Sequence, residues 1–313
     1  MKKILFFVTV LALLFIGCEM SDDSGDSATM TLNLTDAPAL PMSFGEITDV
    51  NIKIDRVEIS VNDEWFTLVD FPTATETGEF DLLDLQEGTV AALADEIEIP
   101  SGTIGQIRFY LDAAEDDSQS SACYITYTAD EGVTYQTMDV YIPSAQNSGL
   151  KFVGGFDAPS NGEVDITADF DVRKSLKYVK GQLKMNPTIK LIVSGEAGHI
   201  SGTVTGDTSA YSNVAVYAYE DGTYSAAELA FDLTDSSEDN DIPLLNSVGT
   251  AGINDDGSFT IAYLAEGTYD LYLAGLLITD PVTEAGNYTL LASLDDSPVV
   301  AGEMTSGQDI TIP

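Results

Sequence analysis

Apolar and polar residues alternate with a period of two along most of this chain. In VNIKIDRVEISV (residues 50–61), every second residue from Val50 to Ile54 is apolar and its neighbours are polar. Successive side chains of a β-strand point to opposite faces, so this pattern is typical of a strand buried on one face. The apolar phase then shifts by one position at Val57, which predicts a β-bulge at Asp55–Arg56.

The same alternation predicts strands in most of the chain. One segment, VAALADEI around residues 90–97, predicts a short helix instead. A second series of strands and turns begins at Gly198, and SGEAG (194–198) is the predicted junction. We therefore expect an all-β fold, with two β-sandwich domains in tandem at residues 29–195 and 198–313. The other predicted strands of the first domain lie at 30–34, 65–69, 104–111, 123–128, 134–142, 150–156, 163–172 and 183–193.

The first eighteen residues, MKKILFFVTVLALLFIGC, have the pattern of a bacterial lipoprotein signal peptide. Two lysines precede an uncharged apolar run that is too short to span a bilayer comfortably. The segment Phe15-Ile16-Gly17-Cys18 resembles a lipobox, although leucine is usual where Phe15 stands. We expect removal of residues 1–17, lipidation of Cys18, and a flexible acidic tether over residues 18–28. Ordinary secretion with loss of Cys18, or an uncleaved anchor, is the alternative.

Charge is distributed unevenly in this chain, whose formal net charge is −40. Residues 196–313 contain 20 acidic residues and no lysine or arginine. Such a surface repels phosphate polymers and binds cations diffusely, so nucleic acid is not an expected partner.

Six of the twelve lysines and arginines lie in DFDVRKSLKYVKGQLKMNPTIK (169–190). The preceding strand lines one face with aspartates, and a hairpin closed by VKG (179–181) would set lysines opposite them. Local compensation of those aspartates is the first interpretation of the basic residues. Docking of the acidic second domain and contact with an anionic envelope ligand are the alternatives.

The sequence offers little catalytic apparatus. His199, at the predicted junction, is the sole histidine, and Cys123 is the sole cysteine after Cys18. One histidine and one cysteine cannot supply a usual zinc site, and Cys123 in CYITYT fits a small buried hydrophobic residue. A glycosidase needs only two carboxyl groups, but nothing marks out a pair among so many. We expect no enzyme activity and no cofactor.

One strand offers a candidate sugar-binding surface. In NVAVYAYED, residues Val216 and its alternate neighbours would face the core, which turns Tyr217 and Tyr219 to the opposite face. Asn213 and Glu220 flank these tyrosines and could hydrogen-bond a glycan held on the ring faces. The alternative is that another segment covers the two tyrosines.

The acidic loop DSSEDND (235–241) is a weak calcium candidate through Asp235, Asp239 and Asp241. It lacks the glycine and the distal glutamate of an EF-hand, so a solvated loop is the simpler interpretation. The longer segment from Asp232 to Asn246 is too polar to be expected in a core.

Six blocks of the first domain together resemble the bacterial lipoprotein family called domain of unknown function 4382. That family carries no assigned chemistry, so the resemblance implies location and architecture. The blocks are LNLTDAPA (32–39), IDRVEIS (54–60), FDLLDLQEG (80–88), IPSGTIGQIRF (99–109), PSAQNSGLKF (143–152) and DFDVRKS (169–175).

In the second domain, Asp256-Gly257-x-Phe259-x-Ile261 and Gly267-x-Tyr269-x-Leu271 resemble the carboxypeptidase regulatory-like domain, a prealbumin-like sandwich. Domains of that kind are usually non-catalytic, and the wider fold group includes carbohydrate-binding members.

Together these features predict a non-catalytic envelope or cell-surface protein, anchored to the outer membrane through Cys18, that acts as a binding or adhesion module. Carbohydrate is the candidate ligand. A structural or accessory protein that binds another envelope component is the alternative, and a glycoside hydrolase is a more distant one.

Overall fold

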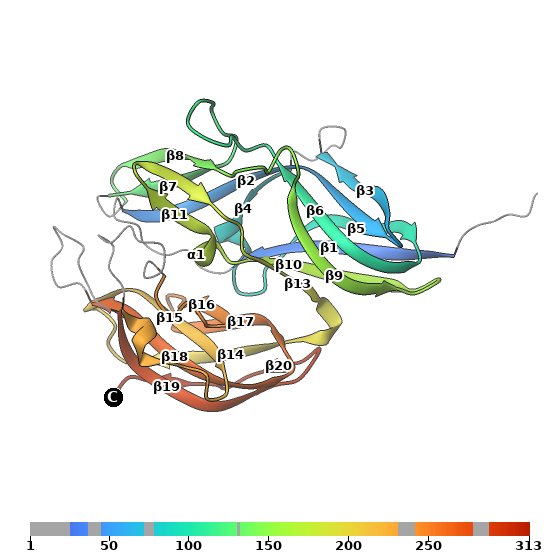
Figure 1. Ribbon diagram of the computed structural model, residues 1–313. Helices are drawn as coiled ribbons and strands as arrows, with labels where there is room; N and C mark the ends of the chain where they lie inside the picture. The colour runs from blue at the N-terminus through green and yellow to red at the C-terminus, as the bar shows by residue number, and fades with distance from the viewer. Residues whose placement is uncertain (1–25, 37–44, 72–77, 130–131, 231–241, 278–287) are drawn as a thin grey trace, which may run out of the picture.

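The computed structural model describes residues 26–36, 45–71, 78–129, 132–230, 242–277 and 288–313, and these ranges fold as an all-β protein. Figure 1 shows two stacked sandwiches, the first built from the blue to yellow-green strands and the second from the yellow to red strands. None of the helices in the described ranges is long and apolar enough to cross a bilayer. The predicted fold class is therefore confirmed, whereas the predicted signal peptide and Cys18 lie outside the described residues.

The first sandwich consists of two sheets. Sheet 1 has the strand order β13-β10-β1-β5, and sheet 2 has the order β11-β12-β8-β7-β2-β6-β9, with β3 and β4 also paired to β2. The strands are β1 (Ser27–Asp36), β2 (Glu46–Val61), β3 (Glu64–Asp70), β4 (Glu79–Asp81), β5 (Ala91–Pro100), β6 (Gly102–Leu111), β7 (Tyr124–Thr128), β8 (Tyr135–Tyr141), β9 (Leu150–Ala158), β10 (Glu163–Phe170), β11 (Leu176–Val179), β12 (Gln182–Met185) and β13 (Ile189–Val193).

The second sandwich also has two sheets. Sheet 3 has the order β17-β14-β20, with β21 paired to β14, and sheet 4 has the order β16-β15-β18-β19. The strands are β14 (Ala197–Thr205), β15 (Tyr211–Glu220), β16 (Gly249–Gly252), β17 (Ser258–Ala265), β18 (Gly267–Leu277), β19 (Tyr288–Val299), β20 (Met304–Thr305) and β21 (Ile310–Thr311). The short helical segments of the described chain are η2 (Leu82–Leu85), α1 (Val172–Ser175), η3 (Ser194–Glu196) and η4 (Ala226–Leu229).

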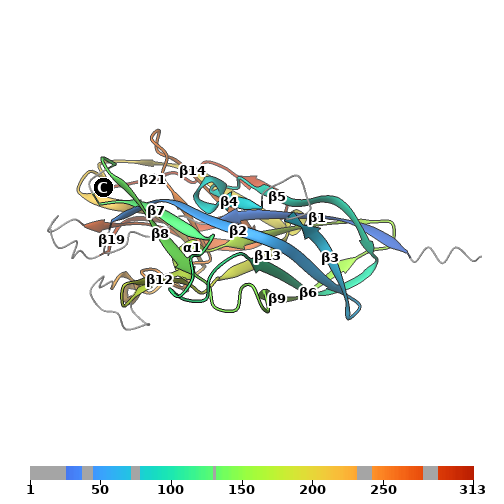
Figure 2. The same cartoon turned by 90° about the horizontal axis from the view of Figure 1, so that it is seen from above.

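The long strand β2 confirms the predicted bulge. The pairing of β2 with β6 shifts register between Ile54 and Arg56, so Asp55 is the extra residue. Apolar residues on both sides of the bulge, from Val50 to Val61, are buried in the same core. Figure 2 shows β2 running along the first sandwich, from beside β7 to beside β3. The bulge at Asp55 therefore keeps the residues from Val50 to Val61 facing the core, and a second register shift, between Ile47 and Asp49, brings Ile47 into the same core at the start of this sixteen-residue strand.

Two predicted elements differ in the structure. The expected helix around residues 90–97 is the strand β5, which pairs antiparallel with β1. An available sheet edge outweighs the helix preference of a short alanine-rich segment, because pairing satisfies backbone groups along the whole of β1. In addition, β1 begins at Ser27, so the folded chain starts before the predicted end of the tether at residue 28. The other predicted domain limits stay predictions.

The basic stretch forms a hairpin, but not the predicted one. VKG closes the turn between β11 and β12, with Lys180 and Gly181 at φ 53° and 83°. In this hairpin Lys177 lies opposite Lys184, so two like charges face each other. Strand β10 pairs instead with β1 and β13, and Lys190 alone lies opposite an aspartate, Asp169. The interpretation of these lysines as partners for the aspartates of β10 therefore holds for Lys190 and is wrong for Lys184.

Candidate functional site

A single helical turn, α1, follows β10 in the first sandwich and contacts the second sandwich. Asp171 caps the turn, because its carboxylate accepts a hydrogen bond from the backbone N–H of Lys174 at 3.0 Å. The hydroxyl of Ser175 donates to the carbonyl of Asp171 at 2.6 Å. This capped turn projects Arg173 and Lys174 out of the first sandwich and toward the second.

Arg173 is almost completely buried, with 2% of its surface exposed. Its Nη1 donates to the carbonyls of Pro243 and Leu244, both at 2.9 Å, and its Nη2 donates to Oγ of Ser247 at 2.8 Å. The carboxylate of Asp171 lies 3.6 Å from Nη2. Arg173 thus belongs to the first sandwich, and its hydrogen-bond partners lie in the second.

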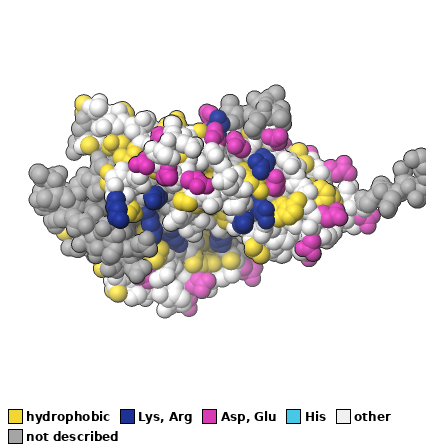
Figure 3. Space-filling view, turned by 45° about the horizontal axis from the view of Figure 1, so that its top comes forward, with side chains coloured by type: hydrophobic (Ala, Val, Ile, Leu, Met, Phe, Trp, Pro, Cys, Tyr) yellow, Lys and Arg dark blue, Asp and Glu magenta, His cyan; other side chains and the backbone are white. Residues whose placement is uncertain are grey.

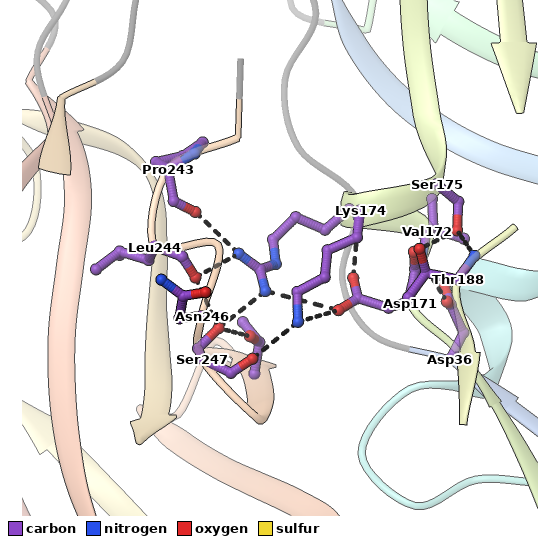
Figure 4. Close-up of polar contacts among 12 residues, drawn as sticks. Asp36, Asp171, Val172, Lys174, Ser175, Thr188, Pro243, Leu244, Asn246 and Ser247 are labelled. Carbon is purple, nitrogen blue, oxygen red and sulfur yellow. Dashed lines mark hydrogen bonds and ion pairs between the residues drawn. The ribbon is translucent and has the colours of Figure 1, made fainter. Parts of the chain in front are cut away.

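Lys174 makes a second, parallel contact. Its Nζ donates to the carbonyl of Ser247 at 2.8 Å and forms an ion pair with Asp171 at 3.1 Å. Figure 4 shows the Lys174 side chain extending toward Ser247, with Asp171 beside it. Burial lowers the pKa of Lys174, and the Asp171 carboxylate opposes that shift. We call Arg173 and Lys174, with their acceptors at Pro243, Leu244 and Ser247, the arginine clamp.

The arginine clamp supports one sequence-based alternative and corrects one prediction. Part of the basic stretch does dock the acidic second sandwich, which accepts these cations through backbone carbonyls and a hydroxyl, and no carboxylate among the described residues of that sandwich takes part. The end of the polar segment 232–246 also enters the interior, since Leu244 and the adjacent Ser247 are 0% and 1% exposed. A polar segment is stable in this position because its carbonyls are satisfied by buried donors.

Beside the clamp lies a pocket of about 520 Å³ between the two sandwiches, which we call the junction pocket. We call its buried lining residues the floor, its half-buried lining residues the walls, and its exposed lining residues the rim. The floor consists of Arg173, Ala215, Tyr217 and Tyr288, the walls include Thr208, Tyr211, Asn213, Val214 and Thr250, and the rim includes Glu46, Asn254 and Asp255.

A β-bulge in β15 shapes the pocket wall. The pairing of β15 with β18 is interrupted between Ser212 and Ala215, and Asn213 has a φ of 49°. Asparagine is one of the few residues other than glycine that commonly adopt this left-handed conformation. Bulges redirect side chains, and this one places Asn213 and Val214 on the wall of the pocket.

One donor of Arg173 remains without an acceptor. The Nε atom is buried and makes no hydrogen bond within the described residues, although the two Nη atoms are bonded. The guanidinium carbon lies 5.5 Å from the centre of the Tyr217 ring, which also belongs to the pocket floor. A buried N–H without an acceptor is costly, so this donor lowers the net stabilisation that the Nη hydrogen bonds of Arg173 provide.

The predicted tyrosine surface is wrong. Tyr217 and Tyr219 do turn away from the core between sheets 3 and 4, as the alternation indicated, but they are 1% and 0% exposed. A second apolar cluster covers this face of sheet 4, and in it Tyr219 packs edge-on against Tyr224 and Tyr272. The Tyr219 hydroxyl donates to Glu228 at 2.9 Å. Neither ring face is open to a sugar.

The other predicted ligand-binding residues have different outcomes. Asn213 lines the junction pocket together with Tyr217, whereas Glu220 is exposed and is not among its lining residues. The calcium candidates Asp235, Asp239 and Asp241 lie outside the described residues, as does Cys18. Sequence reasoning offered the basic stretch 169–190 as a docking site for the second domain only as an alternative, and it did not single out Arg173 and Lys174. The signal that could have found them is Asp171-Val172-Arg173-Lys174, a helix-capping pattern directly after a strand.

A different acidic group does come together in the second sandwich. The carboxylates of Asp221, Asp270 and Asp296 lie within 4.8 Å of one another. Asp270 is buried, and its two oxygens accept hydrogen bonds from the backbone N–H groups of Gly222 at 3.0 Å and Asp296 at 3.2 Å. These bonds account for the buried carboxylate without a cation.

Cys123 is a core residue, and His199 is half-buried against an aromatic ring. Cys123 is a free thiol with 0% exposure, and burial raises its pKa to about 12, so it is protonated at neutral pH. The prediction that it is a small buried hydrophobic residue is confirmed. His199 is half-buried in β14 and packs edge-on against Tyr263, with 5.1 Å between ring centres. Burial lowers the pKa of His199, so the ring is neutral at pH 7.

Comparison with known proteins identifies the first sandwich. The family described as Domain of unknown function (DUF4382) matches residues 27–187, which is just over half of the chain. The chain belongs to this family. Within the DUF4382 match lie Arg173, Lys174 and the rim residue Glu46, whereas the rest of the named pocket residues come from the second sandwich. The resemblance of the second sandwich to carboxypeptidase regulatory-like domains stays a prediction.

Solved structures give weak likenesses to this DUF4382 protein. The Bacillus anthracis TIE protein is 12% identical, with a TM-score of 0.19 over 91% of this chain and 34% of its own. A leucine-rich repeat protein from Bacteroides thetaiotaomicron is 12% identical, with a TM-score of 0.17 over 92% and 26%. A putative adhesin from Bacteroides ovatus is 9% identical, with a TM-score of 0.21 over 98% of both chains. The chain thus spans about a third and a quarter of the first two, and scores this low do not establish a common fold.

Proposed function

We propose that this DUF4382 protein is a non-catalytic, lipid-anchored protein of the outer membrane or cell surface that binds carbohydrate in the junction pocket. The observation that carries the proposal is the pocket itself, about 520 Å³ in volume and lined by hydroxyl, amide and carboxylate groups around a buried floor. Ligand pockets commonly have this size and lie where two structural units meet. The proposed site is concave, whereas the sugar-binding surface predicted from the sequence was flat and exposed.

Side-chain chemistry supports a sugar as the ligand. Asn213 and Thr250 offer both hydrogen-bond donors and acceptors on the walls, and the rim carboxylates of Glu46 and Asp255 offer acceptors for hydroxyl groups. Tyr211 and Val214 add apolar surface beside them, which suits the C–H faces of a sugar ring. The lipid anchor at Cys18 is an independent part of the proposal and rests on the N-terminal sequence.

Retention on a glycan array, followed by calorimetry with the retained glycan, tests the carbohydrate assignment. We expect Asn213→Ala and Thr250→Val to weaken binding at least tenfold, because each removes a polar group from the wall. Glu220→Gln is the matched control, since Glu220 is a neighbouring polar residue of β15 outside the pocket. No retention on a broad panel, or equal losses for Glu220→Gln and Asn213→Ala, would contradict the proposal.

Two further measurements test the rest of the proposal. Mass spectrometry of the mature N-terminus should find a diacylglyceryl group on Cys18, and surface labelling of intact cells should reach the protein. An unmodified Cys18 would contradict the proposed lipid anchor. A reducing-sugar assay with the retained glycans should detect no hydrolysis, and release of sugar would favour the glycoside hydrolase alternative.

A structural or accessory role in the envelope is the second candidate function. The observation that favours it is an apolar groove of about 590 Å³ between the edge strands β9 and β13, with Val153 83% exposed. An edge strand can pair with an extended segment of another protein. Crosslinking in the native membrane should then recover one stoichiometric partner, and its loss in Val153→Lys would support this role.

A further inference from the structure

The free edge of β9 has a sequence that is complementary to itself. We infer that two copies of this chain pair antiparallel along β9, about a two-fold axis at Gly154, and so join their two sheets 2 into one continuous sheet. This inference goes beyond the carbohydrate proposal. It names the partner of the edge strand on which the second candidate function rests.

The edge of β9 is open to another strand. β9 is the last strand of sheet 2, and its outer edge pairs with none of the described strands. Residues 150–157 alternate between half-buried and exposed without a break, although Gly154 and Gly155 together lie opposite the single residue Gly105 of β6. Proline and repeated charges, which commonly protect a sheet edge, are absent from β9, where Lys151 and Asp157 are the only charged residues.

The groove beside this edge opens onto the core of the first sandwich. Phe152 and Phe156 of β9 line it from one side, and Ile189 and Leu191 of β13 line it from the other. All four side chains are half-buried and pack against the main core cluster. A strand added at β9 would place its own inward-facing side chains over them, and covering this apolar surface favours the pairing.

The charged residues of β9 are complementary in a pair of copies. With the axis at Gly154, Lys151 of one copy lies opposite Asp157 of the other, and the symmetry repeats this pair. Within its own chain Lys151 lies opposite Arg108, and it forms no ion pair with a described carboxylate. Figure 3 shows dark-blue side chains gathered on one visible face, with magenta side chains among and around them. A second copy thus supplies the carboxylate that Lys151 lacks in its own chain.

The apolar residues between these charges also fit one another. In the same register Phe152 of one copy lies opposite Phe156 of the other, on the side of the groove. On the outer side Val153, which is 83% exposed, lies opposite Gly155, where a Cβ would meet only open space. Moving the axis by one residue in either direction loses both the charge pair and the phenylalanine pair. The sequence of β9 therefore specifies the register with Gly154 on the axis.

Cysteine crosslinking in the native membrane tests the pairing and its register together. In Lys151→Cys with Asp157→Cys, the thiols of opposite copies should lie within disulfide distance, so mild oxidation should give a covalent dimer. Each single variant is the matched control, because equivalent cysteines of the two copies would lie about 20 Å apart along the strands. The native Cys123 is fully buried and should not react. No covalent dimer from the double variant, or an equal yield from a single variant, would overturn the inference.

Charge reversal tests the same residue pair by analytical ultracentrifugation of the full-length protein in detergent. Lys151→Asp and Asp157→Lys should each weaken self-association about tenfold or more, since two like-charge pairs replace two opposite-charge pairs. The two changes together should restore association to within a few fold of the parent protein. Lys177→Asp, in β11 at the other edge of sheet 2, is the matched control and should leave association unchanged. No self-association of the parent protein, or no restoration in the double variant, would overturn the inference.

The outcomes distinguish this inference from both proposed functions. Recovery of a different envelope protein crosslinked at β9, with no dimer of this chain, would overturn the inference and leave the second candidate function standing. Glycan binding should be the same in the parent protein and in Lys151→Asp, because the junction pocket contains no residue of β9. Failure of the β9 pairing therefore leaves the carbohydrate proposal standing, and failure of glycan binding leaves the β9 pairing standing.

Discussion

The two sandwiches solve the same packing problem in different ways. The first encloses one apolar cluster between sheets 1 and 2, and it carries all the described lysines and arginines. The second has two clusters, one between sheets 3 and 4 and another on the outer face of sheet 4. Sheet 4 therefore has an apolar cluster on each face, although its sandwich has many acidic residues and no lysine or arginine.

This difference explains how an acidic sandwich docks onto a basic helical turn. The second sandwich presents carbonyl groups to Arg173 and Lys174, and such groups bind cations without adding to the negative charge of the interface. Further contacts extend the junction, because Lys190 donates to the carbonyl of Tyr263 at 3.3 Å and Asn254 donates to Glu87 at 3.0 Å. The outer cluster of sheet 4 and the clamp together hold the floor of the junction pocket.

The largest effect on stability is expected from a variant that disrupts the outer cluster of sheet 4. Tyr219→Ala removes a fully buried ring that contacts Tyr224 and Tyr272, and we expect it to lower the free energy of unfolding by about 3–5 kcal/mol. Urea titration followed by far-UV circular dichroism measures this change. Tyr219→Phe, which loses only the bond to Glu228, should cost about 1 kcal/mol. A cost near zero for Tyr219→Ala would mean that sheet 4 has an open face after all.

The second largest effect on stability is expected from a variant that removes the arginine clamp. Arg173→Ala leaves the buried carbonyl of Pro243 and the hydroxyl of Ser247 without their donor, and we expect a loss of about 3 kcal/mol in stability. Limited proteolysis between the sandwiches should also accelerate. Lys177→Ala is the matched control, since this lysine lies four residues on and makes no described contact with the second sandwich. Equal stability of the two variants would show that the clamp contributes nothing.

A third effect depends on pH and sharpens the electrostatic part of the comparison. Burial, with repulsion from Asp171, raises the pKa of Asp169 from 3.8 to about 6. A raised pKa favours the folded state below pH 4, and this contribution is lost as the pH rises through about 6. Asp169→Asn should therefore stabilise the protein by about 1–2 kcal/mol at pH 8 and by almost nothing at pH 4. Urea titrations at the two pH values test this, and a benefit that is equal at both would contradict it.

The smallest effect concerns the lysines of the β11–β12 hairpin. Since Lys177 and Lys184 face each other, the variant Lys177→Gln, Lys180→Gln, Lys184→Gln should change the free energy of unfolding by less than about 0.5 kcal/mol. Thermal melting measures it against the parent protein. A loss above about 1 kcal/mol would revive the interpretation that these lysines compensate the aspartates of β10.

Local pattern predicted much of this fold because strands buried on one face have a clear periodicity. The alternation placed β2, and even the extra residue at Asp55, since a shift of one position is visible in the sequence. The pairing partners of the strands were harder to predict from the sequence. The lysines near Asp169 suggested a hairpin with β10, but β1 from the start of the chain takes one edge of that strand in parallel. Contacts this distant leave no local signal.

The site was predicted only in part for a related reason. Alternation correctly put Tyr217 and Tyr219 on one face of β15, but it cannot tell whether that face meets solvent or a second cluster. The bulge at Asn213 interrupts the alternation at the wall of the pocket. The clamp depends on the direction in which a one-turn helix projects its side chains. A basic stretch in the sequence does not specify that direction.

The most direct test of the junction pocket as the binding site is hydrogen–deuterium exchange with and without a retained glycan. Binding in the pocket predicts slower exchange in residues 211–216 and 250–253, which include most of its lining residues, and unchanged exchange in residues 151–156 of the β9 edge. Protection confined to the β9 edge, or absent from both walls of the pocket while the glycan is bound, would contradict the account.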